Sequence, residues 1–465
     1  MSLMKKSAQK ARAQACCLLP TYSADTFGVC SALFELGGMV VIHDPSGCNS
    51  TYTTHDEPRW YDTDSLIFIS AMNEYDAILG RDDRLLQNLI ETVRAELPRF
   101  LCLIPSQIAY LIATDLQAIA RAVERATGVP SFTLPTNSMH DAERGIYLAL
   151  EEIARRIPPS SARTGGSRLR VNVLGVTPLD FPLAGTRQSL ADFLVQADAT
   201  LQSCWAMDCT YEELCTAAAA DVSLVISYGG LGAARVLQER FGIPYVIGAP
   251  IGPLKAPLAD ALHEVAHHAA RRASFRRSGS DTPAHLSMTT TITTPPNVQQ
   301  ILNTKKYPAD KSAASEKEYT WPQSLLPLMH AGGSSAPNAP ATSIIGEGIF
   351  AASLAAALQA ADGRNARLIV PTAHAPQLLP PGTITCPSET ALIAMLADTA
   401  VLLADPLYQA LCPPDLPFLP LPHTACSGRL YEAQQRNLLD DAAFSALLKE
   451  LRYKAPLQNY GKESP

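Results

Sequence analysis

The chain has 465 residues, 47% of them hydrophobic and 17% charged, with a formal net charge of −7. That length predicts about three domains, each with a core of its own. The acidic balance and the lack of any Lys/Arg block argue against nucleic acid as the main partner. No apolar run reaches the roughly 18 residues of a membrane span, and the N-terminus lacks a signal-peptide core. With eleven irregularly spaced cysteines, we expect a reduced, cytoplasmic protein with no membrane partner.

Two isolated thiols stand out near the N-terminus. Cys30 is expected to start a helix over residues 30–36 that ends at the Gly37-Gly38 pair. Cys48 closes a Pro-Ser-Gly-Cys turn directly after the apolar run 39–42, and glycine allows the tight bend there. No Cys-x-x-Cys pair exists, which excludes a zinc ribbon. Two such thiols can hold half of an iron–sulfur cluster if a second chain supplies the rest.

The residues after Cys48 carry a resemblance to a known family. A Gly47-Cys48 turn is followed by a stretch from Ser70 to Gly80 that contains Met72 and Glu74. In this order and at about this distance, these residues resemble the component 1 family of nitrogenase-like oxidoreductases. That family includes the α and β subunits of the molybdenum–iron protein, their cofactor-assembly relatives, dark-operative protochlorophyllide reductase and the F430 reductive cyclase.

The elements predicted in chain order agree with the fold that this resemblance implies. Residues 1–166 alternate strands and helices in a parallel βαβ pattern, with helices at 85–97 and 116–127 and strands at 99–104 and 131–134. Residues 167–273 repeat the pattern, with strands at 171–175 and 221–227 and helices at 189–196 and 231–240. We therefore expect an α/β protein with three Rossmann-like domains, whose parallel sheets surround a central cleft as in the nitrogenase iron–molybdenum protein.

The periodicity fails over residues 274–340, which are rich in Ser, Thr and Pro. This composition predicts a linker or an insertion. The third domain and its C-terminal helices are expected over residues 341–465, with strands at 367–370 and 400–404 and a helix at 389–396.

The third domain opens with a Gly-x-Gly-x-x-Ala turn, from Gly346 to Ala351. Such a turn between a strand and a helix can place phosphates on the helix N-terminus. A dinucleotide site would also need an acidic residue after the next strand, and residues 370–374 contain none. A structural turn is therefore favoured over a nicotinamide site.

His263, Glu264 and His267 form a His-Glu-x-x-His pattern on a predicted helix. Its spacing puts both imidazoles on one helical face, where zinc could bind with the glutamate as base. A zinc peptidase is therefore a remote alternative. No third ligand follows nearby, so a solvated helix face is favoured.

The family resemblance also implies site residues. Cys30 and Cys48 match cluster ligands, whereas Ser106 stands where relatives have a third cysteine, and we expect it to be a neighbour of the cluster and not a ligand. Two thiols from each of two chains suit one shared [4Fe-4S] cluster. A homodimer is therefore expected, with a heterodimer with a related subunit left open.

His423 follows a Pro-Phe strand and precedes a Ser-Gly pair and Tyr431. This order is similar to the nitrogenase α subunit, in which such a histidine ligates the metal cofactor, so His423 is a candidate catalytic residue. The same cofactor needs a cysteine in the strand-to-helix turn of the middle domain. Residues 226–230 contain none, and no molybdenum cofactor is expected.

The predicted function is that of a nitrogenase-like component 1 subunit. The chain has no GxxxxGK[ST] loop, so a separate ATP-dependent iron–sulfur protein would donate the electrons. The chain would pass them to a substrate in the interdomain cleft. A cofactor-assembly scaffold of the same family, without turnover, is the alternative.

Overall fold

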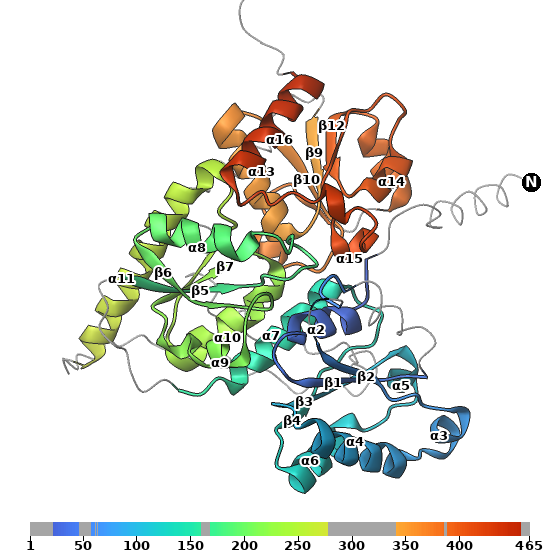
Figure 1. Ribbon diagram of the computed structural model, residues 1–465. Helices are drawn as coiled ribbons and strands as arrows, with labels where there is room; N and C mark the ends of the chain where they lie inside the picture. Colours follow the sequence, from blue (N-terminus) through green and yellow to red (C-terminus); the bar gives the residue numbers. More distant parts are fainter. Residues whose placement is uncertain are drawn as a thin grey trace, which may run out of the picture.

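The computed structural model describes residues 22–45, 57–60, 62, 64–159, 168–277, 341–385 and 388–456. It contains three parallel sheets, each built from one continuous stretch of the chain, and so confirms the predicted α/β fold class (Figure 1). Cys48 lies outside the described residues, as does most of the predicted linker. Helix α11 (Lys255–Arg277) runs without interruption into the first residues of that linker.

The first sheet has the strand order β2-β1-β3-β4, and all its pairs are parallel. Its strands are β1 (Met39–His43), β2 (Leu66–Ile69), β3 (Leu101–Pro105) and β4 (Ser131–Thr133). Every residue of β1 is buried, because alternate side chains point to opposite faces of the sheet and helices cover both. Val40 and Ile42 pack toward α2 (Asp25–Leu33), whereas Met39 and Val41 pack against α4 (Asp82–Glu96) and α6 (Leu116–Thr127).

The second sheet has the strand order β6-β5-β7-β8. Its strands are β5 (Leu169–Leu174), β6 (Ala199–Cys204), β7 (Val222–Val225) and β8 (Tyr245–Ile247), and its helices are α8 (Thr186–Gln196), α9 (Tyr211–Cys215), α10 (Leu231–Phe241) and α11. A short 3-10 helix, Tyr228–Gly230, leads from β7 into α10. Gly230 is required there because a Cβ would lie 2.5 Å from the Leu174 carbonyl oxygen.

The third sheet has the order β11-β10-β9-β12-β13. Its strands are β9 (Ala341–Ile345), β10 (Ala366–Val370), β11 (Ile384–Thr385), β12 (Thr399–Ala404) and β13 (Phe418–Pro420). Helices α13 (Gly348–Asp362), α14 (Glu389–Leu396), α15 (Thr424–Ser427) and α16 (Asp441–Lys454) accompany them. Within the described parts of the chain, no helix has the length and apolarity needed to cross a membrane.

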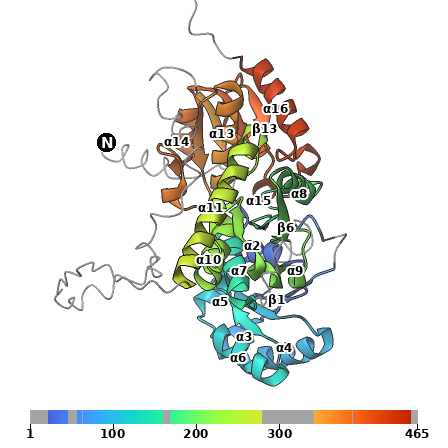
Figure 2. The same ribbon diagram turned by 90° about the vertical axis from the view of Figure 1, so that its left-hand side faces the viewer.

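Helix α7 (Ala142–Arg156) joins the three sheets, and the sequence patterns above did not predict it. It packs against α2 of the first domain and α10 of the second (Figures 1 and 2). Its N-cap residue, Asp141, also accepts a 2.7 Å hydrogen bond from the backbone N–H of Ala373 in the third domain. The N-terminal end of α7 therefore lies where the three domains meet.

One local prediction in the first domain was wrong. Cys30 lies well inside α2, which begins at Asp25 and ends at Leu33. The backbone is extended at Ala24, and the helix begins at the next residue, Asp25. The Asp25 carboxylate fixes this start, because it accepts hydrogen bonds from the backbone N–H groups of Asn137 and Ser138. The thiol is therefore presented by the middle of a buried helix and not by its first turn.

Candidate functional site

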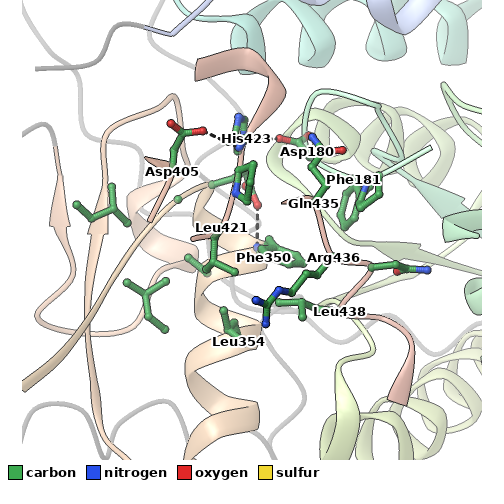
Figure 3. Close-up of a pocket in the computed structure, with 18 of the residues that line it drawn as sticks. Asp180, Phe181, Phe350, Leu354, Asp405, Leu421, His423, Gln435, Arg436 and Leu438 are labelled. Atoms are coloured by element: carbon green, nitrogen blue, oxygen red, sulfur yellow. Dashed lines mark hydrogen bonds and ion pairs between the residues drawn. The ribbon is translucent and has the colours of Figure 1, made fainter. Parts of the chain in front are cut away.

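A cavity lies between the second and third domains, with about 750 Å³ of empty space including the part open to solvent. One part of its wall is apolar and includes Phe181, Phe350 and Leu421. Another part is ionisable, with Asp180, Glu347, Asp405 and His423 (Figure 3). A mostly apolar hollow with a few convergent polar groups is the usual form of a small-molecule site.

His423 lies on the wall of this cavity, at the N-terminal end of α15. The Asp405 carboxylate holds this turn, because it accepts hydrogen bonds from the His423 backbone N–H at 2.9 Å and from the Ser427 hydroxyl at 2.7 Å. The Tyr22 ring packs edge-on against the imidazole, with ring centroids 5.4 Å apart. The imidazole is therefore held in a fixed orientation toward the second domain.

Asp180 faces His423 from the loop after β5. Its Oδ1 lies 3.0 Å from His423 Nε2, and its Oδ2 accepts a 2.9 Å hydrogen bond from the Thr177 hydroxyl. Burial disfavours charge on either group, but their mutual attraction outweighs it. The pKa of Asp180 is therefore lowered and the pKa of His423 raised from their ordinary values.

Glu143, in the first turn of α7, completes a three-residue cluster with Asp180 and His423. One potential ligand atom from each residue lies within 4.8 Å of the other two. The Glu143 side chain is only 1% exposed, and neither of its oxygens has a hydrogen-bond partner within the described chain. Burial and the neighbouring Asp180 carboxylate raise the pKa of Glu143 well above its usual value.

Glu347 is the central residue of the Gly-Glu-Gly turn before α13. Its carboxylate accepts hydrogen bonds from the backbone N–H groups of Tyr228, Ile349 and Phe350. Burial, with a contribution from Asp180, raises its pKa to about 7. The N–H groups that would bind a phosphate at the start of α13 are thus occupied by the protein's own side chain, which supports a structural role for this turn.

The structure describes two of the three residues that the sequence predicted at a cluster. Cys30 is 3% exposed and lies on the same face of the first sheet as Cys102. Burial, followed by the nearby Glu57 carboxylate, raises the pKa of the Cys30 thiol. Ser106 is 1% exposed, and its hydroxyl has no hydrogen-bond partner among the residues described. Cys30 offers a soft sulfur ligand of the kind that iron–sulfur groups use, and Cys48, its expected partner, lies outside the described residues.

The His-Glu-x-x-His pattern lies on the solvent-exposed face of α11. His263 Nε2 lies 2.7 Å from the Ala197 carbonyl oxygen, and Glu264 lies 3.7 Å from His268 on the same helix. The only three-residue group with metal-ligand geometry in the described ranges is the one at Glu143. The part of the chain that the structure describes therefore assembles no zinc site at this helix.

Sequence reasoning found one member of the cavity's ionisable wall, His423, and missed Asp180, Glu347 and Asp405. It also missed Glu143, which joins Asp180 and His423 in the buried cluster. For Glu347, a usable signal was an acidic residue between two glycines at the start of a helix. For Glu143 and Asp180 no local pattern pointed to a site, since their meeting with His423 depends on the packing of three domains.

Comparison with known proteins identifies the family. The family model described as nitrogenase component 1 type oxidoreductase matches residues 26–278, which is more than half of the chain. The chain belongs to this family. This confirms the resemblance seen at residues 47–80.

Several curated members of the family are similar to this chain. It is 27% identical to one subunit of the light-independent protochlorophyllide reductase of Prosthecochloris aestuarii, over 46% of this chain and 39% of that one. It is 26% identical to the nitrogenase iron-molybdenum cofactor biosynthesis protein NifE of Rhodobacter capsulatus, over 40% of this chain and 39% of that one. These matches therefore span about two fifths of each relative's length.

Solved structures extend the similarity over nearly the whole chain. Two nitrogenase Cp1 structures, at pH 5 and pH 6.5, superpose with TM-scores of 0.58 and 0.62 at 12% identity. They cover 94% and 95% of this chain, and 89% and 93% of their own. At this identity the similarity shows that the component 1 fold is shared.

Proposed function

We propose that the chain is the component 1 subunit of a nitrogenase-like reductase. It would accept low-potential electrons from a separate ATP-dependent iron–sulfur protein and pass them to a substrate in the cavity between the second and third domains. The observation that carries the proposal is the cavity itself, with an apolar wall and a buried ionisable wall around Asp180 and His423. Open parallel sheets bind their ligands in such crevices.

The electrons would enter through an iron–sulfur cluster at Cys30 and Cys48. When bound, such a cluster supplies one-electron transfer at a potential that depends on burial and hydrogen bonding. The protein contributes a rigid, dry setting on the Cys30 side. Arg59, whose side chain is 4% exposed, donates hydrogen bonds to the Ser31 carbonyl oxygen on α2 and to the Ala206 carbonyl oxygen of the second domain. Ser106 would lie beside the cluster without binding it.

A second copy of the chain would supply the other two thiols. The first domain exposes large apolar side chains on two short helices, α3 (Glu74–Leu79) and α5 (Gln107–Leu111), which follow β2 and β3. Tyr75, Ile78, Leu79 and Leu111 are each at least 67% exposed. Exposed apolar clusters of this kind mark interfaces. Because α5 begins directly after Ser106, a contact there would place the partner near the proposed cluster, as a homodimer requires.

A cofactor-assembly scaffold is the second candidate. Relatives named as iron-molybdenum cofactor biosynthesis proteins, NifE and NifN, support it. On that account, the cavity would hold a metal cluster as cargo. No cysteine lines the cavity among the described residues, and a molybdenum or vanadium cluster is not expected in the proposed reductase.

Electron transfer from an ATP-dependent donor tests the reductase proposal. We expect the cluster of the anaerobic protein to be reduced, by electron paramagnetic resonance, when a reduced Fe-protein-like donor and MgATP are both present. ADP in place of ATP is the control and should leave the cluster oxidised. Sustained turnover with dithionite alone, without any ATPase, would contradict the proposal. Reduction of the cluster without turnover of any reducible substrate would favour the scaffold.

A further inference from the structure

We propose that Glu143, Asp180 and His423 bind one divalent transition-metal ion at the inner wall of the cavity. The donor set contains two carboxylates and one imidazole, each from a different domain. This inference goes beyond the proposed electron transfer and does not depend on the iron–sulfur cluster.

The spacing of the three side chains suits a single ion. His423 Nε2 and Asp180 Oδ1 are 3.0 Å apart, and all three donors lie within 4.8 Å of one another. Two ligands about 2.1 Å from one metal in adjacent positions are separated by roughly 3.0–3.4 Å. The distance between the imidazole and the carboxylate is therefore that of neighbouring ligands.

Hydrogen bonding within the described chain leaves most of these potential metal-ligand atoms without a partner. Both oxygens of Glu143, Oδ1 of Asp180 and both ring nitrogens of His423 are buried without a well-aligned hydrogen bond to any described residue. The Nε2–Oδ1 contact is short, yet it does not meet hydrogen-bond geometry. Buried polar atoms are almost always paired, so several orphans pointing at one spot indicate a missing partner.

The buried carboxyl groups around the spot outnumber the cationic side chain that pairs with them, His423. Glu143, Asp180, Glu347 and Asp405 bring four buried carboxyl groups to this region. In the described ranges, no ion pair joins any of the four to a lysine or arginine. A divalent ion would neutralise two of the carboxylates directly, at lower cost than leaving them charged in a dry interior.

The donor types limit the metal. Carboxylate oxygens with one imidazole suit Mn²⁺, Fe²⁺ or Zn²⁺ better than a soft thiophilic ion. Thr177 holds the second oxygen of Asp180, and Asp405 holds the backbone of His423, which orients two of the ligands. Three protein ligands leave positions open toward the cavity, where an oxygen-bearing substrate could bind.

Manganese titration tests the site. The anaerobically purified protein, treated with a chelator that spares its iron, would be titrated with Mn²⁺ while free Mn²⁺ is measured by electron paramagnetic resonance. We expect one ion per chain, displaced by Zn²⁺, and pulsed spectra that show coupling to a histidine nitrogen. Glu143→Gln and His423→Asn should each weaken binding by roughly tenfold or more. Glu264→Gln and His267→Asn, which change the same residue types on the exposed face of α11, should bind Mn²⁺ as the unaltered protein does.

The outcomes separate this site from the iron–sulfur proposal. Cys30→Ser should lose iron and still bind Mn²⁺. No binding at millimolar Mn²⁺, binding that neither Glu143→Gln nor His423→Asn weakens, or a bound ion without nitrogen coupling would overturn the proposal. The nitrogen coupling is measured on the unaltered protein, so the test stands even if a variant fails to fold.

Discussion

His43, the last residue of β1, has a pKa lowered from its ordinary value of 6.5. It is 7% exposed, and its Nδ1 lies 2.8 Å from the Ser70 hydroxyl. Burial is the main cause of the shift. The carboxylates of Asp82, Asp44 and Asp76 act in the opposite direction and do not outweigh it. The folded state therefore favours the neutral imidazole.

This shift predicts a pH-dependent stability. As the pH falls, the His43 imidazole takes up a proton in the unfolded chain before it does so in the folded protein. The stabilisation from neutral His43 is therefore fully present above pH 6.5 and is lost as the pH falls from that value toward the lowered pKa of the folded state. Each unit of lowering corresponds to about 1.4 kcal/mol. We expect urea denaturation of His43→Asn to depend less steeply on pH between roughly 5 and 7 than that of the unaltered protein. His268→Asn, at an exposed position, is the control, and equal slopes for His43→Asn and the unaltered protein would contradict the prediction.

At the scale of elements, the crossing of α2 and α7 depends on two glycines. A Cβ on Gly145 would lie 1.9 Å from the Asp25 carbonyl oxygen, and one on Gly28 would lie 2.0 Å from the Ala142 carbonyl oxygen. Both obstacles are backbone atoms, which cannot rotate away. The two helices therefore pack in backbone contact, and this contact fixes Cys30 on α2 relative to Glu143 on α7.

Gly145→Ala should consequently lower the free energy of unfolding by about 1–3 kcal/mol or more, because the two helices must separate. Chemical denaturation measures the change. Gly346→Ala is a suitable control, since its added Cβ would meet only the Ala351 Cβ, at 3.8 Å. A Gly145→Ala variant as stable as the Gly346→Ala variant would show that the close crossing is not needed.

Local rules predicted many elements well. The helices Leu116–Thr127 and Glu389–Leu396 have the predicted bounds, because Asp115 and Ser388 cap their N-termini and Gly128 ends the first of them. Helix α7 also carries readable signals, an Asp141 N-cap and the pairs Glu151–Arg155 and Glu152–Arg156. Its position between three domains is not local information. For that reason the residues around His423 in the sequence were enough to identify it as a candidate, whereas its contact with Asp180 and Glu143 could not be predicted.

At the scale of the whole molecule, the proposed reductase combines two sites of different chemistry. The two thiols proposed to bind the cluster, Cys30 and Cys48, belong to the N-terminal part of the chain. The oxygen and nitrogen donors of the other site meet where the second and third domains join α7. A shared cluster at a twofold interface would connect the first site to a partner chain and leave the cavity within each chain. The apolar helices α3 and α5 then have a partner to cover them.

Iron and sulfide analysis of the anaerobically purified protein, with an electron paramagnetic resonance spectrum of its reduced form, tests the central claim most directly. Four thiolates per dimer predict about four irons and four sulfides, without stoichiometric molybdenum or vanadium. Cys48→Ser and Cys30→Ser should lose most of the iron and loosen the dimer, whereas Ser106→Ala and the control Cys215→Ser should keep it. Full iron in Cys48→Ser, or about eight irons per dimer at one site, would contradict the account.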